Sequence, residues 1–194
     1  MKTFFLLLIA FIPVLSFAQA FDRLPKDENG KIYYSEVIHV DSVNKNQLYL
    51  NSKKLFVDAL KSNIETIQMD DKEAAIIIAK CFYDIYGLTQ TGLANLNELD
   101  RVAQMVYTLK IQCKEGRYKY EIYNISFANT NMKIPKMTPA EDYFDNGQES
   151  KFRGPKYDRI ICKNAMEEYI QSLVVLIKSS MYRSGLHNDN KDNW

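Results

Sequence analysis

Residues 107–126 read YTLKIQCKEGRYKYEIYNIS, and this stretch decides the fold. Apolar and polar side chains alternate on both sides of Glu115-Gly116. This pair is typical of a hairpin turn, because glycine adopts positive φ without strain. A two-residue turn fixes the register of the two strands, and the expected pairs are Lys114 with Arg117, Ile111 with Tyr120, and Leu109 with Ile122.

One face of this hairpin is almost continuously apolar. Its members are Met105, Tyr107, Leu109, Ile111, Tyr118, Tyr120 and Ile122. An apolar sheet face must be covered by another layer of structure, so we expect helices to pack on it.

Upstream of the hairpin, the pattern predicts a strand, a helix and two further strands. Ile32–Val40 is rich in β-branched and aromatic residues, as strands are. Asn44 followed by Gln47 resembles a capping box, and apolar residues then recur every three or four positions, which indicates an amphipathic helix. Strands are expected at 64–70 and, after a tight turn at Asp71-Lys72, at 73–86, with a loop over 87–99.

Downstream, a long loop over 129–158 separates the hairpin from a helix over 159–183 and a polar tail over 185–194. The apolar stripe of this helix contains Cys162, Met166, Tyr169, Ile170, Leu173, Ile177 and Met181. The predicted order is β-α-β-β-β-β-α, an α+β fold with a curved antiparallel sheet of about five strands and two helices on one face. We find no repeat and no second core, so residues 21–184 are predicted to form a single domain.

The N-terminus has the three parts of a secretory signal peptide. Lys2 precedes a run of twelve apolar residues at 4–15, and small residues follow at 16, 18 and 20. The run is shorter than the roughly 20 residues that a membrane span needs. We therefore expect residues 1–18 to be removed, with cleavage after Ala20 as the alternative, and the protein to be periplasmic or secreted without a transmembrane segment.

Mass spectrometry of the protein from its native host tests this expectation. The new N-terminus should be Gln19 or Phe21. A cytoplasmic protein with an intact Met1 would contradict it.

Three segments together resemble a known family. They are GKIYYSEVIHVDSVNKNQLYLNSKKLF, IQMDDKEAAIIIAK and the hairpin YTLKIQCKEGRYKYEIYNIS. The chain between Gly30 and Ser126 is similar to an exported bacterial family known as domain of unknown function 4468. The resemblance implies a fold like one half of the TATA-box-binding protein (TBP), and it implies no catalytic or cofactor-binding residues.

Charge and composition argue against nucleic-acid binding. The chain has 25 Lys+Arg and 24 Asp+Glu, and the first 18 residues hold one base and no acid, so the exported chain would have a charge of 24 − 24 = 0. Nucleic-acid-binding domains carry a marked basic excess. An exported, neutral chain is therefore not expected to bind DNA or RNA.

The sequence predicts no catalytic, cofactor or metal site. His39 and His187 lie far apart, and Cys81, Cys113 and Cys162 form no CxxC motif, so we expect three buried thiols, although an exported protein permits a disulfide. The acids of the long loop lack the alternating ligands of a calcium loop, and they are Glu141, Asp142, Asp145 and Glu149.

The candidate binding surface is the hairpin face opposite the helices. The alternation predicts an apolar patch there, formed by Val102, Val106, Tyr123, Ile125 and Phe127. We expect a non-enzymatic binding or interaction domain of the cell envelope, which would bind an envelope protein or a small ligand on this patch, although the 129–158 loop could instead cover it. Two alternatives stay open, a hydrolase with carboxylates from separate loops and a structural envelope protein.

Overall fold

The structure is a computed structural model that describes residues 24–41, 43–60, 63–88, 99–129, 137–144 and 156–182. The strands are β1 (Tyr34–His39), β2 (Ile64–Asp71), β3 (Ile76–Leu88), β4 (Leu99–Lys114), β5 (Arg117–Asn129) and β6 (Met137–Pro139). The helices are α1 (Lys45–Lys54), the π-helical turn η1 (Leu55–Ala59), α2 (Ala140–Phe144) and α3 (Lys156–Met181). The predicted signal peptide, His187 and the polar tail lie outside the described residues.

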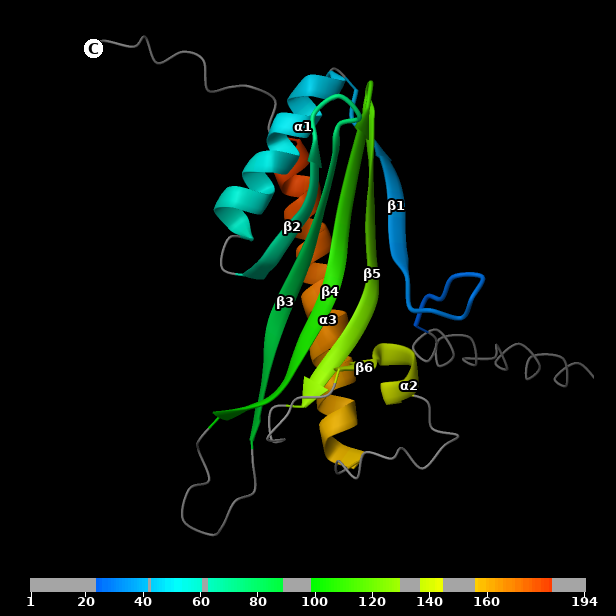
Figure 1. The fold of residues 1–194 in the computed structure, drawn as a ribbon, viewed down its shortest axis with the longest axis vertical. Helices are drawn as coiled ribbons and strands as arrows, with labels where there is room; N and C mark the ends of the chain where they lie inside the picture. The colour runs from blue at the N-terminus through cyan, green and yellow to red at the C-terminus, as the bar shows by residue number, and fades with distance from the viewer. Residues whose placement is uncertain are drawn as a thin grey trace, which may run out of the picture.

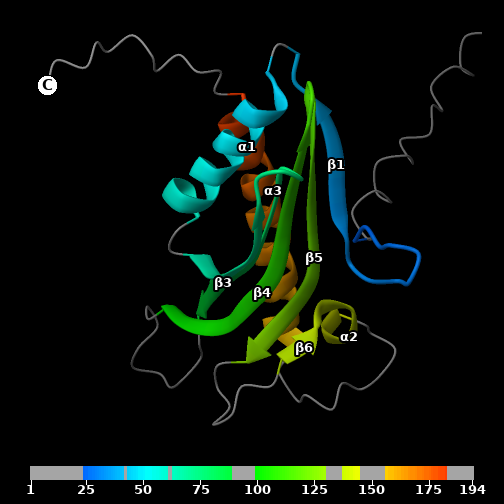
Figure 2. The same ribbon diagram turned by 45° about the horizontal axis from the view of Figure 1, so that its top comes forward.

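The six strands form one antiparallel sheet with the order β1-β5-β4-β3-β2, and β6 pairs with the far end of β5. Helices α1 and α3 lie on the same side of the sheet, and the strands curve along their length (Figures 1 and 2). The predicted fold class and element order are confirmed. The hairpin register is also confirmed from Lys114–Arg117 to Thr108–Tyr123.

The core lies between the sheet and the two helices. The predicted apolar face of the hairpin is buried there, with Leu109, Ile111 and Ile122 fully inaccessible to solvent. The predicted stripe of α3 packs against this face, and its members are buried except for Tyr169, which is partly buried. The three cysteines are buried and free, as expected.

Helix α1 is held at both ends by asparagine side chains. Asn44 caps its N-terminus, because its Oδ1 accepts the Gln47 N–H at 2.8 Å. The other half of the capping box is absent, since the Gln47 side chain donates instead to Asn51 at 2.9 Å. Buried Asn51 donates in turn to the carbonyl of Met181 at 3.1 Å, which satisfies an end carbonyl of α3 and joins the two helices.

A β-bulge in β5 changes which side chains face the core. Asn124 has a φ of 53°, a left-handed conformation that asparagine tolerates better than most residues. The register shifts there, so Val106 pairs with Ser126 and not with the predicted Ile125. Because the side-chain alternation restarts after the bulge, Ile125 and Phe127 turn to the helix side.

Two segments differ from the prediction. The turn before β3 covers residues 72–75, with Ala75 at a φ of 55°, and is longer than the predicted pair Asp71-Lys72. The predicted 129–158 loop contains β6 and α2, and α3 begins at Lys156, three residues earlier than expected. Strand β6 gives the sheet a sixth strand that periodicity could not reveal, because three residues are too few to show alternation.

Strand β3 approaches α3 closely at Gly87. A Cβ atom at this position would lie 2.7 Å from Cγ2 of Val102 and 3.4 Å from Cδ1 of Ile161. Val102 stands at a β4 bulge, where Ile85 and Tyr86 pair with residues 103 and 101. The missing side chain of Gly87 thus gives Val102 its place beside α3.

Gly87→Ala should lower the free energy of unfolding by about 1–3 kcal/mol, because it overpacks this contact. Urea unfolding measures the loss. Val102→Ala removes the clashing methyl, so the double variant should lose less stability than the sum of the two single variants. Additive losses would mean that Gly87 and Val102 do not compete for the same space.

Candidate functional site

The surface that α1 and α3 leave uncovered is the open face, defined here as the side-chain layer on the other side of the sheet. Register and alternation place on it Met69, Ile78, Lys80, Phe82, Tyr86, Val106, Thr108, Lys110, Gln112, Arg117, Lys119, Glu121, Tyr123, Ser35 and Val37. Lys110, Glu121, Lys119 and Arg117 lie toward the β4–β5 turn, and the Arg101–Asp84 ion pair lies at the other end, with Phe82 and Val106 between them.

The centre of the open face holds an ion-paired carboxylate, Glu121. Its two oxygens accept from Lys110 Nζ and Lys119 Nζ at 2.7 Å each, and the hydroxyl of Tyr33 donates to it as well. Lys110 is the cross-strand partner of Glu121, whereas Lys119 lies two residues before it on the same strand. We call these four residues the Glu121 cluster.

The cluster holds the Glu121 carboxyl in its ionised form. The side chain of Glu121 is only 12% exposed, and burial alone would raise its pKa. The hydrogen bonds from the two lysines and from Tyr33 outweigh burial and lower the pKa to about 2. An ionised acid with three donors is a stable structural centre and a poor proton donor at neutral pH.

Beside the cluster, at the turn end of the open face, lies a pocket of about 240 Å³. It is lined by Val37, Gln112, Lys114, Arg117, Tyr118 and Lys119, and we call it the hairpin pocket. Three of these six residues are cationic, while Val37 adds an apolar wall from the edge strand β1. The pocket is therefore suited to a small ligand that carries negative charge.

The structure does not bring the five residues of the predicted patch together on the open face. Ile125 and Phe127 are each 1% exposed and belong to the core, where Phe127 stacks on Tyr143 of α2 at 4.9 Å. Val102 is buried beside Gly87. Only Val106 and Tyr123 stay on the open face, so placing the other three there was wrong, and the two bulges are the physical reason.

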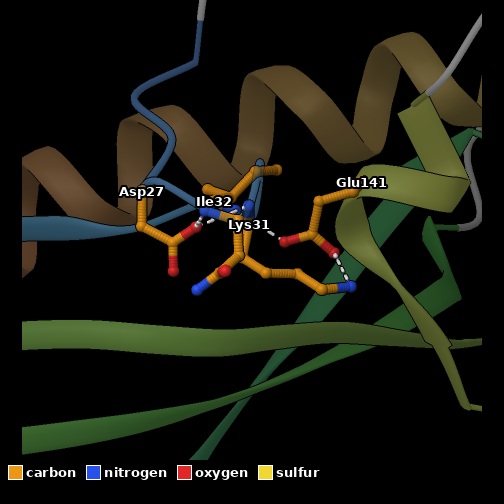
Figure 3. Close-up of polar contacts among 5 residues, drawn as sticks. Asp27, Lys31, Ile32 and Glu141 are labelled. Carbon is orange, nitrogen blue, oxygen red and sulfur yellow. Dashed lines mark hydrogen bonds and ion pairs between the residues drawn. The ribbon is translucent and has the colours of Figure 1, made fainter.

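The partly buried carboxylates are committed to structural contacts. Glu141 of α2 accepts the Ile32 N–H at 2.6 Å and lies 3.6 Å from the Lys31 ammonium (Figure 3). Asp27 accepts the Asn29 and Lys31 N–H groups at 2.9 Å and shapes the turn that brings Lys31 to α2. Glu141, expected as a loop acid, therefore fastens the segment before β1 to α2.

The other predicted chemical candidates are isolated from one another. His39 is exposed at the end of β1, opposite Arg117. Burial raises the pKa of Cys81 and Cys113 to about 12, which keeps both thiols protonated and unreactive. Within the described ranges, no three His, Cys, Asp or Glu side chains are grouped as metal ligands, and no helix is long and apolar enough to cross a membrane.

Comparison with known proteins identifies the domain. Residues 34–128, from β1 to the end of β5, match the family described as "Domain of unknown function (DUF4468) with TBP-like fold". Over these residues the chain is similar to the DUF4468 family. This confirms the family resemblance of the sequence, and the domain contains the open face, the Glu121 cluster and the hairpin pocket. The comparison with curated proteins gave no match.

Two solved structures share the fold of this chain. A TBP-like protein from Parabacteroides distasonis ATCC 8503 is 20% identical, with a TM-score of 0.62 over 83% of this chain and 98% of the other. A DUF4468 family protein from Bacteroides ovatus ATCC 8483 is 17% identical, with a TM-score of 0.63 over 81% of this chain and 90% of the other. At these identities the likeness is one of fold alone.

Glu121→Gln should lower the free energy of unfolding at pH 7, because it removes the negative charge that both lysines contact. Since the pKa of Glu121 lies below its unfolded value, its stabilisation is complete above about pH 4.5 and is lost as the pH falls toward 2. Urea unfolding of both proteins should therefore give a difference that shrinks below pH 4.5. A difference that stays constant down to pH 2.5 would contradict this role for the ionised carboxylate.

Proposed function

We propose that the protein is an exported, non-enzymatic binding domain of the cell envelope and that it binds its partner on the open face. The observation that carries this proposal is the layered arrangement of the sheet. One face is buried under α1 and α3, whereas the other presents the Glu121 cluster, the hairpin pocket and the exposed apolar side chains of Val37, Met69 and Tyr86. Surfaces with an apolar part and a charged rim are common at interaction sites.

Export is supported by the N-terminal pattern alone. A basic residue, twelve apolar residues and small residues at a plausible cleavage site form a signal for secretion. Three free, buried cysteines are compatible with the cytoplasm and with an exported protein, so they neither support nor oppose export.

The hydrolase alternative finds less support in the described residues. It needs two carboxylates in one cleft, one of them free to exchange a proton. Among the described carboxylates in ion pairs, Glu121 and Glu141 are the least exposed, at 12% and 13%, and both are engaged by lysines. The hairpin pocket offers no such pair either, because none of its lining residues is a carboxylate.

Site-specific photocrosslinking in the native host tests the proposal with a matched pair of tyrosines. Tyr86 lies on the open face and is 56% exposed, whereas Tyr182 follows α3 and is 59% exposed. Replacement of each by p-benzoylphenylalanine should give a discrete crosslinked species from the envelope fraction at Tyr86 and none at Tyr182. The same species at both positions, or none at Tyr86, would refute the open face as the binding surface.

A further inference from the structure

The hairpin pocket contains positive charge that the described residues do not balance. Lys119 lies 2.7 Å from Glu121 and shares this carboxylate with Lys110, so its charge is compensated in part. Lys114 and Arg117, which pair with each other across the turn, make no ion pair with any described carboxylate. Two exposed cations thus stand on neighbouring strands at one pocket.

The nearest acid in sequence is directed elsewhere. Glu115 lies between these cations in the chain, at the turn itself. Its Oε2 accepts the backbone N–H of Lys45 at 3.1 Å, at the first turn of α1. Its carboxylate therefore complements the positive end of a helix and leaves the pocket without a negative group.

We propose that the hairpin pocket binds a small organic anion, whose carboxylate or phosphate group contacts Lys114 and Arg117 and whose apolar part lies against Val37. The guanidinium of Arg117 offers two parallel N–H donors, a geometry that suits either oxyanion. Gln112, another lining residue, supplies an uncharged donor and acceptor. This inference rests on the proposed function, because it names the ligand class of the open face.

The size of the pocket and its apolar wall restrict the ligand. Pockets that enclose drug-sized molecules have volumes of about 300–1,000 Å³, and the hairpin pocket, at about 240 Å³, is smaller. Val37 is 51% exposed, a large fraction for an apolar side chain on a sheet. An anion with a short apolar chain would cover Val37, which an inorganic anion cannot do.

Calorimetric titration of the purified full chain with four simple probes tests this ligand class. Hexanoate and hexyl phosphate carry both the anion and the apolar chain, hexanol lacks the charge, and inorganic phosphate lacks the chain. At least one hexyl anion should bind about tenfold more tightly than hexanol and inorganic phosphate. The tighter of the two hexyl anions distinguishes a carboxylate source from a phosphate source.

Variants place the binding in the pocket. Arg117→Gln and Lys114→Gln should each weaken the hexyl anion by about tenfold, as expected for loss of a charge-assisted hydrogen bond. Val37→Ser should weaken the hexyl anion and leave inorganic phosphate unchanged. Lys80→Gln is the matched control, because Lys80 is an open-face lysine paired with Glu65 outside the pocket. Thermal melting shows whether each variant keeps its fold.

Two results would overturn the inference: no heat from either hexyl anion up to about 10 mM, or an equal loss of binding in Lys80→Gln and Arg117→Gln. Failure here is separable from failure of the proposed function. If the anions do not bind but the Tyr86 crosslink forms, the ligand class is wrong and the open face remains the binding surface. If the anions bind and no crosslink forms, the hairpin pocket is an anion site, and the proposal that a protein partner binds the open face is wrong.

Discussion

The apolar face shared by β4 and β5 must be kept from water, and the rest of the structure follows from that constraint. Strand β4, with 16 residues, is the longest of the sheet, and its helix-side residues are buried from Ala103 to Cys113. Helices α1 and α3 both pack on this face and contact each other. The Asn51–Met181 hydrogen bond joins them at the point where α3 ends. The two helices thereby form one connected layer. The side chains of the open face are not needed to cover the core.

The alternation of apolar and polar residues predicts which face each side chain occupies only where the strands have no bulge. The hairpin register from Lys114–Arg117 to Thr108–Tyr123 could be predicted, because a two-residue turn allows a single pairing. Beyond Tyr123 the prediction failed. The left-handed backbone at Asn124 cannot be inferred from one asparagine among many, and it turns Ile125 and Phe127 into the core. A bulge moves every later side chain to the other face, so the bulge at Asn124 displaced Ile125 and Phe127, and the bulge in β4 displaced Val102.

The two features of the open face differ in how far the sequence could have revealed them. The pairing of Lys110 with Glu121 follows from the predicted register, and so does the convergence of Gln112, Lys114, Arg117 and Lys119 at the turn. Val37 belongs to the edge strand β1 and Tyr33 directly precedes it, and the pairing of β1 with β5 brings both to the open face. Local pattern cannot specify that pairing, because it joins residues that are about 80 positions apart. The cluster and the pocket are therefore completed by contacts that only the folded sheet provides.

The two faces of the sheet have different roles: one supplies the buried core, and the other presents the charged side chains. A charged surface is therefore compatible with a stable fold. The buried side chains of the helix side supply most of the hydrophobic stabilisation, and their number does not depend on what the open face presents. On the open face, the Glu121 carboxylate lies between Lys110 and Lys119, at 2.7 Å from each, and it compensates one of their two positive charges, which reduces repulsion at the centre of the sheet. Lys114 and Arg117 lie at the solvated turn, where unpaired cations cost little. The unpaired Lys114 and Arg117 would attract an anion to the turn end, while Met69 and Tyr86 expose apolar surface farther along the sheet.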